Sequence, residues 1–272
     1  MALRAADSDE DAAGAAGRRS PVVPRVFNGA ECATVGNRTL VAELLVVAAE
    51  PRELYGILRR CRGVRKLKWP VWFARVGDLN ANRLVMVANG PGPKLAAQAA
   101  AVALRNGRPG SVISTGYCGA LDPGLAAGEL FVAVRVETDD GAFAAAVPAA
   151  GRRGWKSGTL ASCDQVIGIA EKRRLRETGA SAVDMEAGAL ALAAKRAGLP
   201  FYCIRAVLDR AEEEFDLDFS ALRDEDGRFS RLQILKAALA RPLTRFPELF
   251  RIARRGRKAS RALGEFFADS VF

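Results

Sequence analysis

Apolar runs of strand length alternate with Ala- and Leu-rich runs of helix length from residue 39 to residue 209. Continuous apolar runs bounded by turn residues are typical of strands that are buried on both faces, as in parallel sheets. We expect strands at 39–49, 69–76, 83–88, 111–115, 130–136, 158–162, 183–185 and 201–208, and helices at 51–61, 95–106, 165–178 and 186–197. The alternation predicts an α/β fold, a three-layer αβα arrangement with a mostly parallel mixed central sheet.

The residues on either side of the α/β region, which we place at 38–220, have a different character. Residues 1–37 are rich in small and polar residues and predict a flexible tail. Residues 221–272 predict a basic C-terminal extension with helical stretches near 230–240, 243–255 and 258–270. The net charge is +10, and about a quarter of the basic residues lie between Arg228 and Arg261.

Composition excludes several kinds of site. The 272 residues, half of them hydrophobic, are enough to bury a full core in one main domain. The chain has no His, which rules out His-based triads, bases and metal ligands. Its five cysteines are scattered and never spaced CxxC, so we expect no zinc site, no disulfide framework and no metal or organic cofactor. With no apolar segment typical of a signal peptide or a membrane span, a cytoplasmic location is expected.

The C-terminal stretch has an amphipathic pattern with two interpretations. Its apolar residues fall on roughly one helical stripe made of Leu249, Ile252, Leu263, Phe266 and Phe267. Such a stripe packs against a core or, with basic flanks, lies on an anionic membrane, here the inner membrane face. Nucleic-acid binding is not predicted, because the basic residues are not interleaved with aromatic residues and no recognised module is present.

Acidic residues stand at the ends of two predicted strands around one helix. Asp184 lies in the segment at 183–185, Glu186 opens the helix that follows it, and Asp209 follows the strand at 201–208. In an open α/β sheet, ligands bind beyond the carboxyl ends of the strands. Three converging carboxylates at that edge therefore predict a chemical site.

Three motifs carry a resemblance to a known family. STGYCGALDPGLAAGEL at 114–130, VDMEA at 183–187 and IRAVLD at 204–209 resemble the nucleoside phosphorylase/nucleosidase superfamily, in matching order and spacing. The branch that cleaves 5′-methylthioadenosine and S-adenosylhomocysteine is the most similar over residues 40–215. Residues 226–255 are similar to the end of hopanoid-associated phosphorylases, which act on adenosylhopane. The resemblance implies cleavage of the N-glycosidic bond of a small purine nucleoside with release of adenine, in a homo-oligomer.

Breaking that bond requires a group that donates a proton to the leaving base, a group that binds the ribose, and a nucleophile. Asp209 matches the family's general acid and would protonate the purine N7 if burial raises its pKa. The carboxylate of Glu186 can accept hydrogen bonds from the 2′ and 3′ hydroxyls of the ribose, and Met185 would pack against the apolar face of the sugar. Arg205, four residues before Asp209, is expected on the same strand face, and by resemblance it orders the nucleophile side.

Other positions are assigned by the resemblance alone. The purine pocket is expected to contain Ser162, Val166 and Ile167. Close backbone approach to the ligand is expected at Gly116 and Gly119, where we expect the strand at 111–115 to break. Gly90 and Gly92 in NGPGPK match a Gly-rich turn of the family and would cradle an anion.

The chain departs from the nucleosidase pattern at two places. Tyr117 stands where the nucleosidases have a Ser that helps to place the attacking water. The first strand is followed by AAEPREL, which leaves Glu50, Arg52 or Glu53 as the candidate at the nucleophile. Because a guanidinium binds phosphate whereas a carboxylate repels it, Arg52 would favour phosphate as co-substrate. The sequence does not decide between water and phosphate as the nucleophile. A nucleoside-binding protein that has lost catalysis through the change at Tyr117 is a further alternative.

Overall fold

The computed structural model describes residues 42–150, 154–214, 228 and 239–272. All of them belong to one compact unit, Val41–Phe272. The predicted tail at 1–37 and the helical stretch near 230–240 lie almost wholly outside the described residues. The division into domains at 38–220 and 221–272 stays a prediction.

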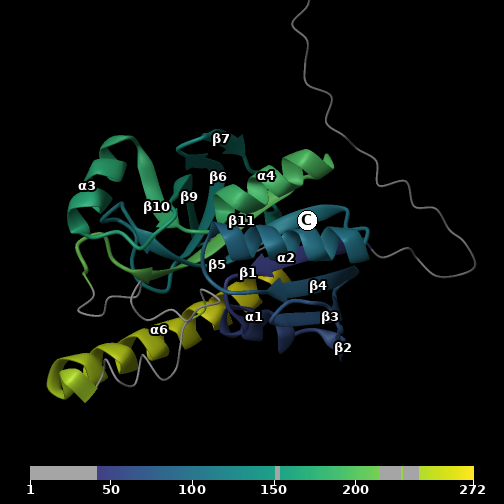
Figure 1. Ribbon diagram of the computed structural model, residues 1–272, viewed down its shortest axis with the longest axis horizontal. Helices are drawn as coiled ribbons and strands as arrows, with labels where there is room; N and C mark the ends of the chain where they lie inside the picture. The colour runs from purple at the N-terminus through teal and green to yellow at the C-terminus, as the bar shows by residue number, and fades with distance from the viewer. Residues whose placement is uncertain (1–41, 151–153, 215–227, 229–238) are drawn as a thin grey trace, which may run out of the picture. The chain divides into compact units, whose positions relative to one another are not determined.

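The centre of the fold is a mixed sheet with the strand order β10-β9-β6-β11-β5-β1-β4-β3-β2 (Figure 1). Its strands are β1 Glu43–Ala48, β2 Arg62–Lys66, β3 Phe73–Leu79, β4 Asn82–Ala88, β5 Ser111–Ala120, β6 Leu130–Thr138, β9 Trp155–Ser162, β10 Ala180–Asp184 and β11 Phe201–Asp209, and β7 Gly141–Ala144 pairs with β6. A separate two-stranded sheet joins β8 Ala149–Ala150 to β12 Ser270–Val271.

The predicted α/β fold with a mixed sheet is confirmed, but antiparallel pairs are more frequent than expected. Strands β11, β5, β1 and β4 are mutually parallel, whereas β6 runs antiparallel to β11 and the β4-β3-β2 end is antiparallel. The edge strand β2 is exposed along its whole length and rich in Arg and Lys, so its hydrophobic pattern gave no strand signal.

One extra pairing closes half of the sheet on itself. The end of β5 pairs antiparallel with β10, at Ala182 with Ala120 and Val183 with Gly119. Strands β5, β11, β6, β9 and β10 therefore form a closed circuit. The consequence is local: the last residues of β10 and β11 both lie beside Cys118 and Gly119 of β5.

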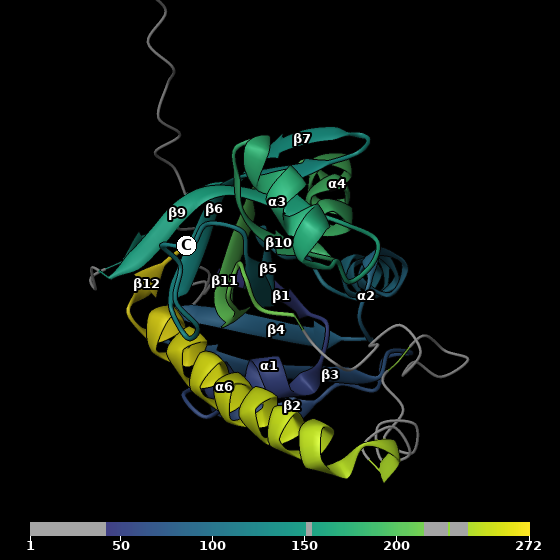
Figure 2. The same ribbon diagram turned by 90° about the vertical axis from the view of Figure 1, so that its left-hand side faces the viewer.

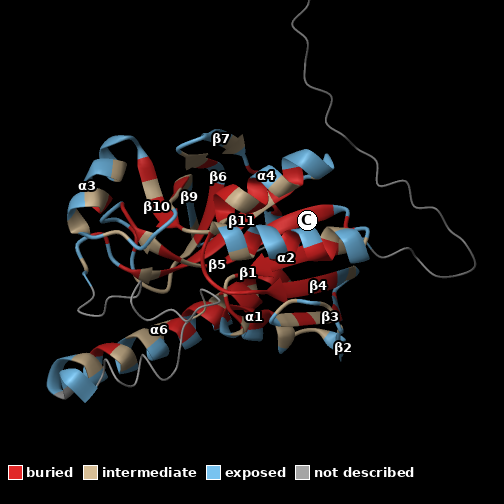
Figure 3. Ribbon diagram, in the orientation of Figure 1, coloured by how far each residue is buried: buried red, intermediate tan, exposed pale blue. Residues whose placement is uncertain are grey.

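Helices cover both faces of the sheet (Figures 1 and 2). Helices α2 (Pro93–Asn106) and α4 (Ala187–Ala197) pack on one face, and α1 (Pro51–Leu58) and α6 (Pro242–Ala268) pack together on the other. Both faces need cover because both are apolar, as strand β1 illustrates. Its Leu45 and Val47 face α2 and α4, while its Leu44 and Val46 face α1 and α6. Figure 3 shows the central strands buried between these layers.

Two local predictions are wrong. Strand β5 does not break at Gly116 but continues to Ala120, because Gly116 adopts φ +140° within the ladder. The stretches predicted at 243–255 and 258–270 are one continuous helix, α6. The stripe of the C-terminal stretch packs inward, since Leu263, Phe266 and Phe267 are buried in the core, as its core-packing interpretation expected. No described helix combines the length and the apolar character that a bilayer span requires.

Candidate active site

A cavity of about 420 Å³ opens where β5, β10 and β11 end. Its wall contains the residues that close these strands, among them Gly119, Asp184 and Asp209. It is completed by residues after β1, the segment before α3 (Ile169–Glu177) and one residue of α6, Ile252. The acids that we expected to converge at the carboxyl edge of the sheet thus lie in the wall of this cavity.

Asp209 is buried at one end of the cavity and pairs with a lysine. Lys172 Nζ of α3 lies 2.5 Å from Asp209 Oδ2 and also donates to the carbonyl oxygens of Arg210 and Glu213, at 3.0 Å each. Burial raises the pKa of Asp209 above its ordinary value, although Lys172 acts in the opposite direction. The carboxylate fits because Gly119 has no side chain: a Cβ there would lie 3.0 Å from Asp209 Oδ2. Asp209 can therefore hold a proton that a solvated Asp would lose.

Glu186 stands at the centre of the wall, where β10 gives way to α4. It is the N-cap residue of α4, and its Oε1 accepts a hydrogen bond of 2.7 Å from the backbone N–H of Gly92. Burial, together with Asp184 and Glu53 nearby, raises the pKa of Glu186 to about 8. The turn NGPGPK thus serves to fix this carboxylate. Gly92 makes the contact, while Gly90 lies outside the lining, has φ +124°, and has no room for a Cβ, which would lie 2.5 Å from Leu95 Cδ1.

A second pair of acids lies at the other end, after β1. Glu53 Oε2 accepts from the backbone N–H of Glu50 at 2.8 Å, and Glu53 Oε1 accepts from that of Tyr117 at 3.0 Å. Burial raises the pKa of Glu53 to about 7, and it also raises the pKa of Glu50 against the effect of its ion-pair partner Arg52. Gly116 does not line the cavity but makes room for Glu53, since a Cβ on it would lie 2.8 Å from Glu53 Oε1.

Tyr117 of β5 connects this strand to helix α6. Its hydroxyl donates to the carbonyl oxygen of Gly256 in α6 at 2.8 Å, and its ring lines the cavity. Burial raises the pKa of Tyr117, so it stays a neutral phenol. The residue that departs from the nucleosidase pattern therefore belongs both to the site and to the packing of α6.

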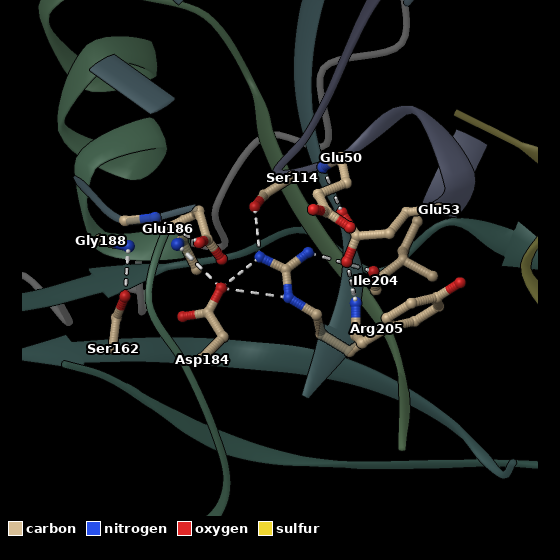
Figure 4. Close-up of polar contacts among 12 residues, drawn as sticks. Glu50, Glu53, Ser114, Ser162, Asp184, Glu186, Gly188, Ile204 and Arg205 are labelled. Atoms are coloured by element: carbon tan, nitrogen blue, oxygen red, sulfur yellow. Dashed lines mark hydrogen bonds and ion pairs between the residues drawn. The ribbon is translucent and has the colours of Figure 1, made fainter. Parts of the chain in front are cut away.

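Arg205 does not reach the cavity. Its side chain is 1% exposed and its guanidinium binds Asp184 Oδ2 through Nε and one terminal nitrogen, and Ser114 Oγ at 2.6 Å (Figure 4). Asp184 Oδ2 also accepts from the N–H of Ala187 at 2.9 Å and so holds the start of α4. The expected common face with Asp209 fails because a bulge between Val207 and Asp209 interrupts the alternation of β11.

The remaining predicted positions divide in two. Met185, Val166 and Ile167 line the cavity. Ser162 does not, because its Oγ accepts from the N–H of Gly188 at 3.0 Å and so supports α4 (Figure 4). Sequence reasoning missed Lys172, which is one of several cations in the run IAEKRRLRE and the only residue of α3 that is buried. Within the described parts of the chain, no group of three or more Cys, Asp or Glu residues could hold a metal ion.

Sequence comparison shows which known proteins this chain resembles. The family model described as "Phosphorylase superfamily" matches residues 44–153 and 143–240. A 5′-methylthioadenosine/S-adenosylhomocysteine nucleosidase of Staphylococcus saprophyticus is 28% identical over 178 residues, which are 55% of this chain and 78% of that protein. An aminodeoxyfutalosine nucleosidase of Helicobacter pylori is 32% identical over 77 residues, 28% of this chain and 33% of that one.

Solved structures show the same fold. The 5′-methylthioadenosine/S-adenosylhomocysteine nucleosidase of S. pneumoniae, bound to a transition-state inhibitor, has a TM-score of 0.63 and 20% identity, covering 84% of this chain and 99% of its own. The nucleosidase from Neisseria meningitidis bound to methylthio-immucillin-A has a TM-score of 0.61 and 22% identity, covering 83% and 98%.

Proposed function

The chain belongs to the phosphorylase superfamily, and within it we propose that this protein cleaves the N-glycosidic bond of an adenosine-derived nucleoside and releases adenine. Its substrates are of the type named for its relatives, 5′-methylthioadenosine and S-adenosylhomocysteine. The observation that carries the proposal is the set of acids in one cavity, Asp209, Glu186, Glu53 and Glu50, whose pKa values are all raised by burial.

Asp209 supplies the proton for the leaving base. As the C1′–N9 bond breaks, its electrons move into the purine, and protonation at N7 neutralises the charge that develops there. Lys172 fixes the orientation of the carboxyl group through Oδ2. Val166 and Ile167 give this end of the cavity an apolar wall suited to a purine.

Glu186 anchors the ribose. Gly92 occupies one lone pair of Oε1, which leaves the other acceptor sites of the carboxyl group for the 2′ and 3′ hydroxyls. Met185 offers an apolar surface to the sugar. The ribose carbon that gains positive character then lies between Asp209 and the acids that follow β1.

The nucleophile is held at the end that contains Glu50, Arg52 and Glu53. In hydrolysis, a carboxylate there accepts a proton from water while the water oxygen bonds to C1′, and Glu53, with a pKa of about 7, suits that role. In phosphorolysis, Arg52 would leave Glu50 and bind the phosphate that attacks C1′. We propose hydrolysis first, because Glu53 is held by two backbone N–H groups and needs no rearrangement.

Chromatography of adenine released from 5′-methylthioadenosine, with and without phosphate, tests the proposal. Release at equal rates in both conditions supports hydrolysis, and release that requires phosphate moves the function to phosphorolysis. Tight binding of the nucleoside with no release in either condition would contradict catalysis and favour the nucleoside-binding alternative.

A second candidate is phosphorolysis of adenosylhopane by a protein that rests on the inner membrane face. It is supported by the outward face of α6, where Leu243, Phe246 and Phe250 are 91%, 45% and 68% exposed. Their spacing continues into exposed Arg254 on the same face, and Arg251 beside it is also exposed. Apolar side chains followed by cations are typical of a helix that lies on an anionic bilayer.

Cosedimentation with vesicles of anionic phospholipid tests this second candidate. We expect binding that Leu243→Ser/Phe250→Ser abolishes, while the pair Val64→Ser/Val134→Ser, also exposed but distant from α6 in sequence, leaves it intact. A wild-type protein that never sediments with such vesicles would contradict membrane contact. We also propose a homo-oligomer, as expected from the resemblance, which sedimentation velocity would test.

A further inference from the structure

A second cavity, of about 690 Å³, lies between α1 and α6. Among the residues that the structure describes, its lining contains five arginines, Arg52, Arg59, Arg60, Arg257 and Arg261, and no acid. Tyr55 and Ser260 add hydroxyl groups to the same wall. A concave site with several guanidinium groups and no carboxylate in its lining attracts an anion.

The charges of these arginines are not equally compensated. Arg60 and Arg261 both pair with Glu265, and Arg52 pairs with Glu50. Among the described residues, no carboxylate lies within ion-pair distance of Arg59 or Arg257, which come from the two opposite walls, α1 and α6. These two side chains therefore have their donors available for a ligand.

The walls of this cavity are held in close contact. The N–H of Gly56 in α1 donates to Ser260 Oγ in α6 at 2.9 Å. A Cβ on Gly56 would lie 1.7 Å from the carbonyl oxygen of Ser260, and one on Gly264 would lie 2.1 Å from that of Gly56. The two helices cross at these small residues, so the cavity beside the crossing is a built feature of the fold rather than a gap between mobile elements.

The second cavity adjoins the active site. Arg52, Tyr117, Leu208 and Ile252 line both cavities. In the proposed complex the purine lies at Asp209 and the ribose hydroxyls at Glu186, so the shared wall is where the substituent on the ribose would leave the active site. The hydroxyl of Tyr117 is fixed to Gly256, which keeps this passage formed.

We propose that the cavity between α1 and α6 binds a carboxylate or phosphate group carried at the end of the substrate's 5′ substituent, through Arg59 and Arg257. This inference rests on the proposed function and adds to it the chemical class of the substituent. Arg59 and Arg257 line only the second cavity, so an anion held by them is set back from the ribose carbon. That position suits a group on a flexible chain better than a nucleophile that must contact C1′.

The test compares two nucleosides of equal length, 5′-(3-carboxypropylthio)-5′-deoxyadenosine and its primary amide. KM and kcat for adenine release are measured for the wild type, for Arg59→Ala/Arg257→Ala, and for the control Arg62→Ala/Arg65→Ala, which removes the same charge from exposed positions on β2. We expect KM for the carboxylate to rise about tenfold or more in the first variant, the size of one charge-assisted hydrogen bond. KM for the amide should stay within about twofold, and the control should change neither.

Equal KM changes for carboxylate and amide, or no change in either, would overturn the inference. Calorimetric titration with inorganic phosphate distinguishes the other source of an anion. If Arg59→Ala/Arg257→Ala weakens the binding of inorganic phosphate but does not change KM for the carboxylate relative to KM for the amide, the cavity holds free phosphate and the inference is wrong. If the wild type releases no adenine from either nucleoside, the proposed function fails. The inference about the cavity is then tested separately, by comparing the calorimetric Kd values of the carboxylate and the amide for the wild type and for Arg59→Ala/Arg257→Ala.

Discussion

Strand β11 carries two buried pairs of opposite charge that differ in their surroundings. Arg205 and Asp184 are enclosed, with side chains 1% and 0% exposed, and Asp184 Oδ2 also holds the start of α4. Lys172 and Asp209, with side chains 6% and 10% exposed, lie against the cavity. The first pair fixes β10, β11 and α4 to one another, whereas the second presents a carboxyl group to a ligand.

The difference teaches that burial and a charged partner do not by themselves identify a catalytic group. Both carboxylates are nearly removed from water and both have a cation within hydrogen-bond distance. Both acids belong to residues that line the cavity, and what separates them is the partner: Arg205 is wholly enclosed and does not line the cavity, whereas Lys172 lines it together with Asp209, whose side chain keeps some exposure. We therefore expect changes at Asp209 to act on turnover and changes at Arg205 to act on folding.

The largest effect is expected for Asp209→Asn. Loss of the general acid should lower kcat/KM for adenine release by about 10²- to 10⁴-fold. The Asn amide oxygen can still accept from Lys172, so the thermal unfolding midpoint should change little. Asp78→Asn, an exposed Asp of β3, is the matched control and should keep wild-type activity. Near-wild-type turnover in Asp209→Asn would contradict its role.

Arg205→Met should act on stability instead. Removing the cation leaves Asp184 buried without compensation, which costs about 3–5 kcal/mol. Urea unfolding monitored by circular dichroism measures this loss. The double variant Arg205→Met/Asp184→Leu, which removes both charges, should recover part of it. A loss below about 1 kcal/mol in the single variant would show that the pair does not hold the strands together.

Lys172→Met should shift the pH profile of kcat/KM. Lys172 lowers the pKa of Asp209, so its removal raises that pKa further. Asp209 acts in its protonated form, and activity therefore falls as pH rises through its pKa. The descending limb should move to higher pH, and Lys172→Arg should keep the wild-type limb. An unchanged limb in Lys172→Met would contradict the assignment of that limb to Asp209.

The smallest effect is expected in the pH dependence of stability. Because the pKa of Glu186 is raised to about 8, the folded protein holds this proton more tightly than the unfolded chain does. The free energy of unfolding should then fall as pH rises from about 4.5 to 8. Urea unfolding of Glu186→Gln at pH 5 and pH 8 should show a smaller decrease than the wild type. Equal decreases in both proteins would exclude Glu186 as the source.

Much of the fold and part of the site could be predicted from the sequence. Continuous apolar runs mark β1, β4 and β11 because these strands are covered on both faces. Asp209 and Glu186 could be placed because a residue that ends a central strand or begins a helix has a position fixed by local pattern alone. Glu50 and Arg52, in the turn after β1, were placed at the nucleophile through the family resemblance.

The missed features depend on contacts between distant segments. Nothing in IAEKRRLRE distinguishes Lys172 from its basic neighbours, since its contacts with Asp209 and with the two carbonyl groups that follow β11 depend on the tertiary fold. The bulge before Asp209 reverses the side-chain alternation that placed Arg205 in the site. The inward and outward faces of α6 could not be assigned until its contact with α1 was known, because apolar residues lie on both.

The central claim is that Asp209 donates a proton to N7 of the departing adenine. The most direct measurement compares 5′-methylthioadenosine with its 7-deaza analogue, in which carbon replaces N7, for both binding and base release by the wild-type protein. The account predicts similar Kd values for the two nucleosides and base release from 5′-methylthioadenosine alone. Release of the 7-deaza base at a comparable rate would contradict protonation at N7, and no release from 5′-methylthioadenosine would contradict the proposed activity itself.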